Sequence, residues 1–342
     1  MKAMVLDKVI QISENSKPLR LMNLPDPVPK PDEILIKVST CGVCHTELDE
    51  IEGRTPPTHF PMVLGHQVVG KVEDAGSNAK QFHIGDRVGV AWIYSACESC
   101  ELCLAGKENL CSQFKATGRD AFGGYAELMV VPEGFAQSIP SVFTNEEAAP
   151  LLCAGAIGYR SLRLTGINNG QRLGLTGFGA SAHLVLKLVR YLYPDTDVYV
   201  FARNPNERDF ARDLGAVWTG DTVDRAPRDL HAIIDTTPVW KPVVEAMANL
   251  IPGGRLVINA IRKETSDQEI LSKLRYEDHL WMEKEIKSVA NVTRTDVREF
   301  LDLASRIPIK PDVQTYRLDQ ANTALLELKS QKIRGGKVLA IS

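Results

Sequence analysis

The pattern of hydrophobic and polar positions changes near the middle of this 342-residue chain. In residues 1–90, short alternating runs such as 34–38 and 68–72 are separated by prolines and glycines, which is typical of an irregular β-domain. Residues 92–118 are polar and rich in cysteine, and residues 123–140 return to strand character. From about residue 171, β-like runs alternate with helix-length segments, which predicts βαβ units around a parallel sheet.

The second half has predicted strands at 172–176, 197–202, 231–236 and 255–260, with another near 286–290. Its predicted helices are 180–193, 205–214 and 240–250, and an amphipathic helix follows near 295–306. We therefore expect an α/β protein in which an irregular β-rich domain is joined to a doubly wound parallel sheet.

Composition excludes several classes of protein. With 40 basic and 43 acidic residues, the formal net charge is -3, and there is no basic run of the kind that binds nucleic acid. No apolar stretch reaches the length of a membrane span. Asp7 and Lys8 interrupt the N-terminal segment where an export signal needs an apolar core, so we expect a cytoplasmic protein.

A glycine-rich turn directly follows the predicted strand 172–176. Its pattern is G-x-G-x-x-A, formed by Gly177, Phe178, Gly179, Ala180, Ser181 and Ala182. The first glycine permits a tight turn, the second lets the backbone approach a pyrophosphate, and the last small residue lets the helix pack on the strand. The free N–H groups of the helix N-terminus then face the phosphates.

The next strand would end in an acid if the cofactor were NAD, because that acid binds the ribose hydroxyls. Here Ala202 leaves room for a 2′-phosphate and Arg203 supplies a cation, so NADP is favoured over NAD. The alternative is that Arg203 is a solvated loop charge.

Four cysteines fall within residues 97–111. Cys97, Cys100, Cys103 and Cys111 follow the spacing C-x2-C-x2-C-x7-C. In a cytoplasmic chain this cluster indicates metal ligands, and four thiolates close a tetrahedral, structural zinc site. An iron–sulfur cluster and a nucleic-acid-binding zinc ribbon are the alternatives, and the charge balance disfavours the ribbon.

A second metal site is suggested by Cys44, His66 and Cys153. Two thiolates and one imidazole would leave a fourth position open for water or substrate, as in a catalytic zinc site. Their spacing alone does not establish that they converge, because scattered Cys and His residues are more often core residues.

Several of these motifs occur in one order along the chain. They are Gly42–Thr46, the Gly-His-x-Val-Val-Gly run at 65–70, the four-cysteine segment, Gly123–Glu127, Leu152–Gly155 and Gly177–Ala182. Together they resemble the zinc-dependent alcohol dehydrogenases of the medium-chain dehydrogenase/reductase superfamily, nearest the microbial alcohol and cinnamyl-alcohol-dehydrogenase-like branches. The resemblance implies a GroES-like catalytic domain, 1–154 and 291–342, with the zinc lobe at about 92–118. It also implies a Rossmann dinucleotide-binding domain, 155–290.

The resemblance also implies roles for individual residues. Cys44, His66 and Cys153 become the ligands of a catalytic zinc, and Thr46 becomes the hydroxyl that holds the substrate oxygen and starts a proton relay. His45 would lie near the cofactor pyrophosphate, and Trp92 would form a wall of the substrate pocket. With the four-cysteine site, this makes two zinc ions per chain.

Three positions depart from the family pattern. Gln67 stands where Glu is usual, Glu47 is one methylene longer than the usual Asp that orients the ligand histidine, and Asp49 replaces a relay histidine. The last change puts an acid where an imidazole would buffer near neutral pH. These departures support an alternative, a catalytically silent dehydrogenase fold with a structural or redox-sensing role. A zinc-free quinone-reductase-like relative is a weaker alternative, because the zinc ligands are present.

The expected activity is the exchange of hydride between a primary or aromatic alcohol and NADP(H) or NAD(H). Zinc would act as a Lewis acid on the alcohol or carbonyl oxygen. The expected partners are a small alcohol or aldehyde, with neither nucleic acid nor membrane, and the resemblance implies a homodimer or homotetramer.

Overall fold

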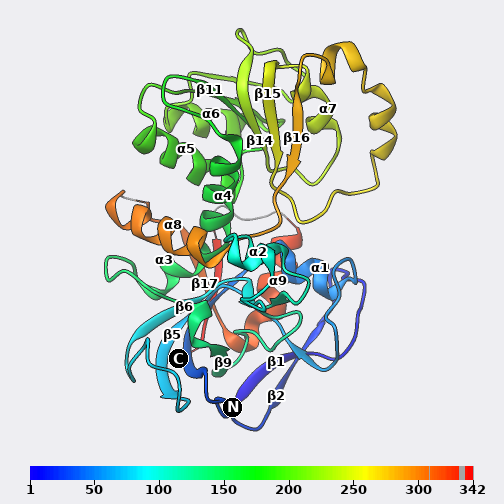
Figure 1. Cartoon of the computed structure of the whole chain (residues 1–342). Helices are drawn as coiled ribbons and strands as arrows, with labels where there is room; N and C mark the ends of the chain where they lie inside the picture. The colour runs from blue at the N-terminus through cyan, green and yellow to red at the C-terminus, as the bar shows by residue number, and fades with distance from the viewer. Residues whose placement is uncertain (308, 331–335, 342) are drawn as a thin grey trace. The chain divides into compact units, whose positions relative to one another are not determined.

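The computed structural model describes residues 1–307, 309–330 and 336–341. The chain folds into two compact units (Figure 1). Unit 1 comprises Met1–Ala156 and Val292–Ser342, and unit 2 comprises Ile157–Asn291. Unit 1 is therefore built from both ends of the chain, with unit 2 inserted in the sequence between them.

The described part of unit 1 is rich in strands, as the alternating pattern predicts. A small sheet has the order β2-β1-β4, and a larger sheet has the order β10-β6-β5-β3-β18-β17, with β9 also paired to β3. A separate pair, β7-β8, lies in the cysteine-rich segment. The strands are β1 Lys2–Leu6, β2 Leu19–Asn23, β3 Glu33–Val43, β4 Met62–Val63, β5 Val68–Ala75, β6 Arg87–Val90, β7 Ile93–Ser95, β8 Lys115–Ala116, β9 Leu128–Pro132, β10 Ala136–Ser138, β17 Val313–Arg317 and β18 Gly336–Ala340.

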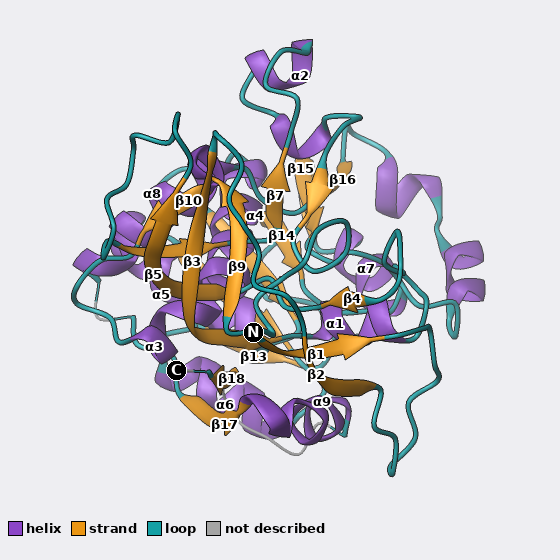
Figure 2. Cartoon of the chain, turned by 90° about the horizontal axis from the view of Figure 1, so that it is seen from below, coloured by secondary structure: helices purple, strands orange, loops and turns teal. Residues whose placement is uncertain are grey.

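Strand β3 is the centre of the larger sheet. Its first half pairs with β9 on one side and β5 on the other, and Figure 2 shows it running between them. Its last four residues pair with β18. Because Ile34, Ile36 and Val38 are completely buried, the register of β3 is specified by its core-facing side chains. The strand ends immediately before Cys44, so the sheet holds the start of the following helix.

The helices of unit 1 lie between and after these strands. They are α1 His45–Ile51, α2 Glu101–Leu104, α3 Asn145–Pro150, α8 Arg294–Arg306 and α9 Ala321–Lys329, with a π-helical turn at Leu151–Gly155. Short 3-10 turns occur at Glu108–Leu110, Glu133–Phe135 and Leu318–Gln320. Helix α3 begins with a capping box, because Thr144 accepts from the Glu147 N–H while the Glu147 carboxylate accepts from the Thr144 N–H. Helix α4, Ala156–Thr165, spans the junction of the two units.

Unit 2 contains, in its described residues, a six-stranded parallel sheet of order β13-β12-β11-β14-β15-β16. Its strands are β11 Arg172–Thr176, β12 Asp197–Phe201, β13 Trp218–Gly220, β14 Leu230–Asp235, β15 Leu250–Ile258 and β16 Glu285–Ser288. Its helices are α5 Ala180–Leu192, α6 Pro205–Asp213 and α7 Lys241–Met247, followed by a 3-10 turn at Gln268–Lys273 and a π-helical turn at Tyr276–Leu280.

This sheet confirms the predicted α/β class with a doubly wound parallel sheet. Right-handed crossovers place α5 and α6 on one face and α7 on the other, as Figure 1 shows. Side chains of β12, β14, β15 and α7 form one buried cluster, including Phe201, Ile233 and Met247. The inner strands β11, β12 and β14 are almost entirely buried because both faces of the sheet are covered there, whereas the edge strand β16 is exposed.

Arg294, the first residue of α8, attaches the C-terminal segment of unit 1 to the cysteine-rich segment. Its guanidinium bonds to Glu108 at 2.9 Å and to Glu98 at 2.7 Å, and it lies 4.2 Å from the ring centre of Phe135. The Glu108 side chain is only 8% exposed. Removing the arginine would leave this carboxylate buried without its cation.

We therefore expect Arg294→Ala to lower the free energy of unfolding by about 2 kcal/mol, measured by urea denaturation of the zinc-loaded protein. Arg298→Ala, at an exposed position one turn further along α8, is the matched control and should change stability by less than about 0.5 kcal/mol. Equal losses in the two variants would contradict this interpretation.

Candidate metal centre and dinucleotide-binding turn

Cys44 precedes helix α1 directly. The helix starts there because the Glu47 carboxylate accepts a hydrogen bond from the Cys44 N–H at 2.7 Å, which satisfies one of the free N–H groups of the first turn. The backbone of Cys44 is extended, so its side chain stands at the junction between β3 and α1. This turn presents the sulfur at the end of the central strand.

His66 and Cys153 reach the same place from two other segments of unit 1. His66 lies between β4 and β5 and is 1% exposed. Cys153 lies in the π-helical turn Leu151–Gly155, which packs against α8 so closely that a Cβ on Gly155 would come within 2.1 Å of the Phe300 ring. Only glycine permits this contact, so the position of Cys153 depends on it.

The three ligand atoms converge. Sγ of Cys44 and Sγ of Cys153 are 3.9 Å apart, and Nε2 of His66 is 3.3 Å from Sγ of Cys153. Zinc–sulfur and zinc–nitrogen bonds of about 2.3 and 2.1 Å give tetrahedral edges of about 3.8 Å between two sulfurs and about 3.6 Å between sulfur and nitrogen. The three residues therefore fit a zinc ion and leave the fourth ligand position open.

Glu47 orients the ligand histidine. Its second carboxylate oxygen lies 2.6 Å from His66 Nδ1, and both side chains are buried. Burial disfavours the imidazolium, but the Glu47 carboxylate raises the pKa of His66 well above its usual value. Because Nδ1 is engaged in this way, Nε2 is turned toward the sulfurs. The extra methylene of Glu47, relative to Asp, does not prevent this contact.

Glu50 is a buried acid that sequence reasoning missed. It is 1% exposed, and neither carboxylate oxygen has a hydrogen-bond partner among the described residues. Burial, reinforced by the nearby Glu47 carboxylate, raises the pKa of Glu50 well above its usual value. The hydroxyl of the fully buried Tyr125 likewise has no partner in the described part of unit 1. The only signal in the sequence is the three-residue spacing from Glu47 on one short helix.

The other residues predicted for this site have different surroundings. Thr46 Oγ1 lies 3.6 Å from the Cys44 sulfur, whereas His45 is exposed. Asp49 is buried and accepts from the Arg54 guanidinium at 2.6 Å. Gln67 is buried, and a Cβ on Gly42 would come within 2.2 Å of its Oε1 atom.

Trp92 is nearly buried in unit 1. Its ring lies 5.1 Å from that of Phe114 and 5.2 Å from the Arg119 guanidinium carbon. Arg119 in turn pairs with Asp120 at 2.7 Å. The Trp92 ring therefore contacts an aromatic ring and the arginine of an ion pair.

The four predicted lobe cysteines also converge. Their sulfurs lie within 4.8 Å of one another, and Sγ of Cys97 is 3.8 Å from Sγ of Cys103. Backbone N–H groups of Ser99 and Cys100 lower the pKa of Cys97 to about 6, which favours the thiolate that zinc requires. Four sulfur ligands close the coordination sphere, so this second zinc site is structural.

The glycine-rich turn of unit 2 begins at the end of β11. Gly177 has φ 74°, and a Cβ there would come within 2.9 Å of Thr236 Oγ1. Among the described residues, no atom lies within 4 Å of a Cβ placed on Gly179, which is exposed, so the backbone before α5 is open to a ligand. Ala182 is completely buried, as expected of the small residue that lets the helix pack on its strand.

Ala202 and Arg203 follow β12, the neighbouring strand. Ala202 is buried and Arg203 is exposed. The carbonyls of both residues accept from the Arg208 guanidinium, at 2.7 and 3.3 Å. The turn after β12 is thus held by Arg208.

Known proteins that are similar to this chain are alcohol dehydrogenases. A model of the alcohol dehydrogenase GroES-like domain matches residues 30–141. The probable alcohol dehydrogenase AdhA of Mycobacterium tuberculosis is 41% identical over 329 residues, which cover 95% of this chain and 93% of that protein. A probable cinnamyl alcohol dehydrogenase of Populus deltoides is 31% identical over 322 residues, covering 89% of this chain and 87% of that protein.

A solved structure gives the same result. The cinnamyl alcohol dehydrogenase SbCAD4 from Sorghum bicolor matches with a TM-score of 0.81 and 26% identity, over 99% of this chain and 97% of that chain. No helix in the described residues has the length and apolar character needed to cross a membrane. With identity extending over nearly its whole length and both zinc-ligand sets in place, the chain belongs to the zinc-type medium-chain alcohol dehydrogenases.

Proposed function

We propose that this protein interconverts primary or aromatic alcohols and their aldehydes with a nicotinamide dinucleotide. The observation that carries the proposal is the convergence of Cys44, His66 and Cys153 on one point with a fourth tetrahedral position open. An open position is what separates a catalytic zinc site from a closed structural one. A mostly apolar pocket, as is usual for small-molecule sites, would favour medium-chain or aromatic substrates.

Cys44, His66 and Cys153 would hold the catalytic zinc. When bound, this ion acts as a Lewis acid toward the oxygen of the alcohol or aldehyde. Glu47 keeps Nε2 of His66 aimed at the site through its 2.6 Å contact with Nδ1. Unit 1 thus supplies the catalytic groups, with Trp92 as a wall of the substrate pocket.

Thr46 would hold the substrate oxygen and take up its proton while passing its own hydroxyl proton outward. Its hydroxyl is close to the ligand sulfur of Cys44, at 3.6 Å, and is partly exposed. Asp49 stands where relatives have a relay histidine, but its carboxylate is bound by Arg54. We therefore assign the first relay step to Thr46 and give Asp49 the role of holding the segment after α1, with Gln67 supporting the ligand loop.

Unit 2 would bind the dinucleotide at the turn Gly177–Ala182. NADP is favoured over NAD because no acid ends β12 and Ala202 is small. The Arg203 guanidinium is exposed and has neither an ion pair nor a hydrogen bond with the described residues. A 2′-phosphate would give this cation a partner.

The proposed activity predicts that zinc-replete protein reduces hexanal or benzaldehyde. The reaction is measured as the loss of NADPH or NADH absorbance. Cys153→Ala should lower kcat/KM by more than about 1,000-fold, because it removes a ligand of the catalytic zinc. Zinc content should fall from about two ions to about one per chain, since the four-cysteine site is separate.

Cys41→Ala is the matched control, because Cys41 is buried but belongs to neither ligand set. It should retain both zinc ions and most of the activity. Absence of turnover in the unmodified, zinc-replete protein would instead favour the alternative of a catalytically silent, structural or redox-sensing protein.

The cofactor preference predicts a selective effect of Arg203→Ala. The KM for NADPH should rise about ten-fold, while the KM for NADH should change by less than about two-fold, because only NADPH carries the 2′-phosphate. NADH is thus the internal control. Parallel changes for both cofactors would contradict the role of Arg203.

We also propose that the protein is at least a homodimer, formed through β16. All four residues of this edge strand are exposed, Ile286 among them at 43%, and Trp281 and Met282, shortly before it in the chain, are 54 and 51% exposed. An exposed edge with apolar neighbours pairs readily with a second copy across a two-fold axis. Further association of dimers would give the homotetramer.

Ile286→Lys should therefore shift the mass measured by light scattering toward the monomer, because a charged side chain on an edge strand opposes pairing. Ile84→Lys is the control, since Ile84 is 70% exposed but lies in unit 1. A monomeric unmodified protein, or equal effects of the two substitutions, would exclude this interface.

A further inference from the structure

A buried ion pair lies at the carboxyl edge of the unit 2 sheet. Asp235 is the last residue of β14 and is completely buried, and the Lys263 side chain is 7% exposed. Asp235 adjoins Thr176, the last residue of β11, in the parallel register. Strands β11 and β14 mark the point where the strand order reverses, and ligands of such sheets bind outside the carboxyl ends of strands at that point.

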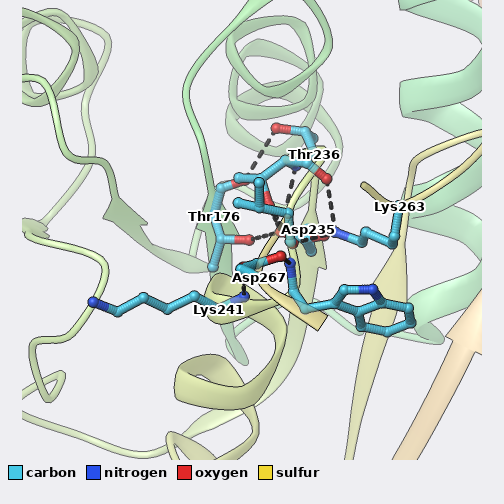
Figure 3. Close-up of polar contacts among 9 residues, drawn as sticks. Thr176, Asp235, Thr236, Lys241, Lys263 and Asp267 are labelled. Carbon is cyan, nitrogen blue, oxygen red and sulfur yellow. Dashed lines mark hydrogen bonds and ion pairs between the residues drawn. The ribbon is translucent and has the colours of Figure 1, made fainter. Parts of the chain in front are cut away.

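The Asp235 carboxylate collects donors from three segments, as Figure 3 shows. Thr176 Oγ1 donates to Oδ1 at 2.5 Å, and Thr237 Oγ1 donates to the same oxygen at 2.7 Å. The Lys263 ammonium pairs with Oδ2. The carboxylate thus joins the end of β11, the loop after β14 and the loop after β15.

The Lys263 ammonium has two further acceptors. It donates to the Thr237 carbonyl at 2.7 Å and to the Val239 carbonyl at 3.0 Å. Together with Asp235, these partners use all three of its donors. Two carbonyls of the loop 236–240 are therefore turned toward a residue that follows β15.

This loop contacts the glycine-rich turn. A Cβ on Gly177 would come within 2.9 Å of Thr236 Oγ1 and 3.0 Å of Thr237 Cγ2. Asp267 fixes the other end of the loop by accepting from the Trp240 and Lys241 N–H groups at 3.0 and 2.8 Å. The loop therefore packs beside the turn that is open to the dinucleotide, and Asp267 and Lys263 hold it from the other side.

We propose that Asp235 and Lys263 are positioning residues that preset the nicotinamide half of the dinucleotide site. The inference rests on the proposed function, in which the adenosine half lies over β12 near Arg203. The other half then lies over the loops after β14 and β15, which the ion pair joins. Because the pair orders these loops before binding, the cofactor does not have to order them itself.

A purely structural pair would behave differently from a positioning pair. A general loss of stability in unit 2 would weaken the binding of every ligand that contacts the glycine-rich turn. Loss of order in the loops alone would weaken the binding of only those ligands that reach the loops after β14 and β15. A ligand consisting of the adenosine half therefore separates the two roles.

The experiment compares the Kd values of NADPH and adenosine 2′,5′-bisphosphate, by cofactor fluorescence and calorimetry, in the zinc-loaded full chain. For Lys263→Met we expect the Kd of NADPH to rise about ten-fold. The Kd of the bisphosphate should change by less than about two-fold, and zinc content should stay the same. Lys241→Met is the matched control, because Lys241 joins the cluster only through its backbone N–H and its side chain extends away (Figure 3).

Single substitutions leave one charge buried, so the double variant Asp235→Asn/Lys263→Met keeps the test valid if a single variant does not fold. The double variant removes both charges and also the hydrogen bonds from Lys263 to the Thr237 and Val239 carbonyls. NADPH binding should therefore again weaken while bisphosphate binding does not. Unchanged NADPH binding, or a parallel loss of both ligands, would overturn the inference while leaving the proposed function intact. Failure of the unmodified protein to bind either ligand would overturn the proposed function and this inference with it.

Discussion

The Glu47 carboxylate holds two parts of the catalytic ligand set at once. One oxygen accepts from the Cys44 N–H and fixes the start of α1, and the other lies 2.6 Å from His66 Nδ1. The carboxylate is fully buried, so it is little screened by water. The relative positions of Cys44 and His66, and with them the open ligand position, depend on this one side chain.

The two zinc sites are built on different physical principles. The four lobe cysteines come from one short segment, and backbone N–H groups stabilise the Cys97 thiolate. The catalytic ligands come from three separate segments, and Glu47 and the close packing of Gly155 on Phe300 bring them together. Metal therefore organises the lobe, whereas the packed core of unit 1 organises the catalytic site.

Unit 2 also combines a site built from one short segment with one built from separate segments, here without a metal. The glycine-rich turn is a local structure that needs only Gly177 at positive φ and an open Gly179. The loops opposite the turn are ordered by the Asp235–Lys263 pair, whose members are separated by 28 residues. Buried polar groups of this kind are stable only when every donor and acceptor has a partner, as the Lys263 ammonium does.

The sequence by itself determined the alternation that builds the unit 2 sheet, the turn at Gly177–Ala182 and the four-cysteine site. Each of these is encoded by neighbouring residues whose spacing sets the geometry. Residues 313–340 carried no comparable pattern, although β18 completes the sheet beside β3. Only the tertiary structure decided that Cys44 and Cys153, 109 residues apart, meet at 3.9 Å. It alone also buried Glu50 and paired Asp235 with Lys263, because these contacts form only when the core brings distant loops together.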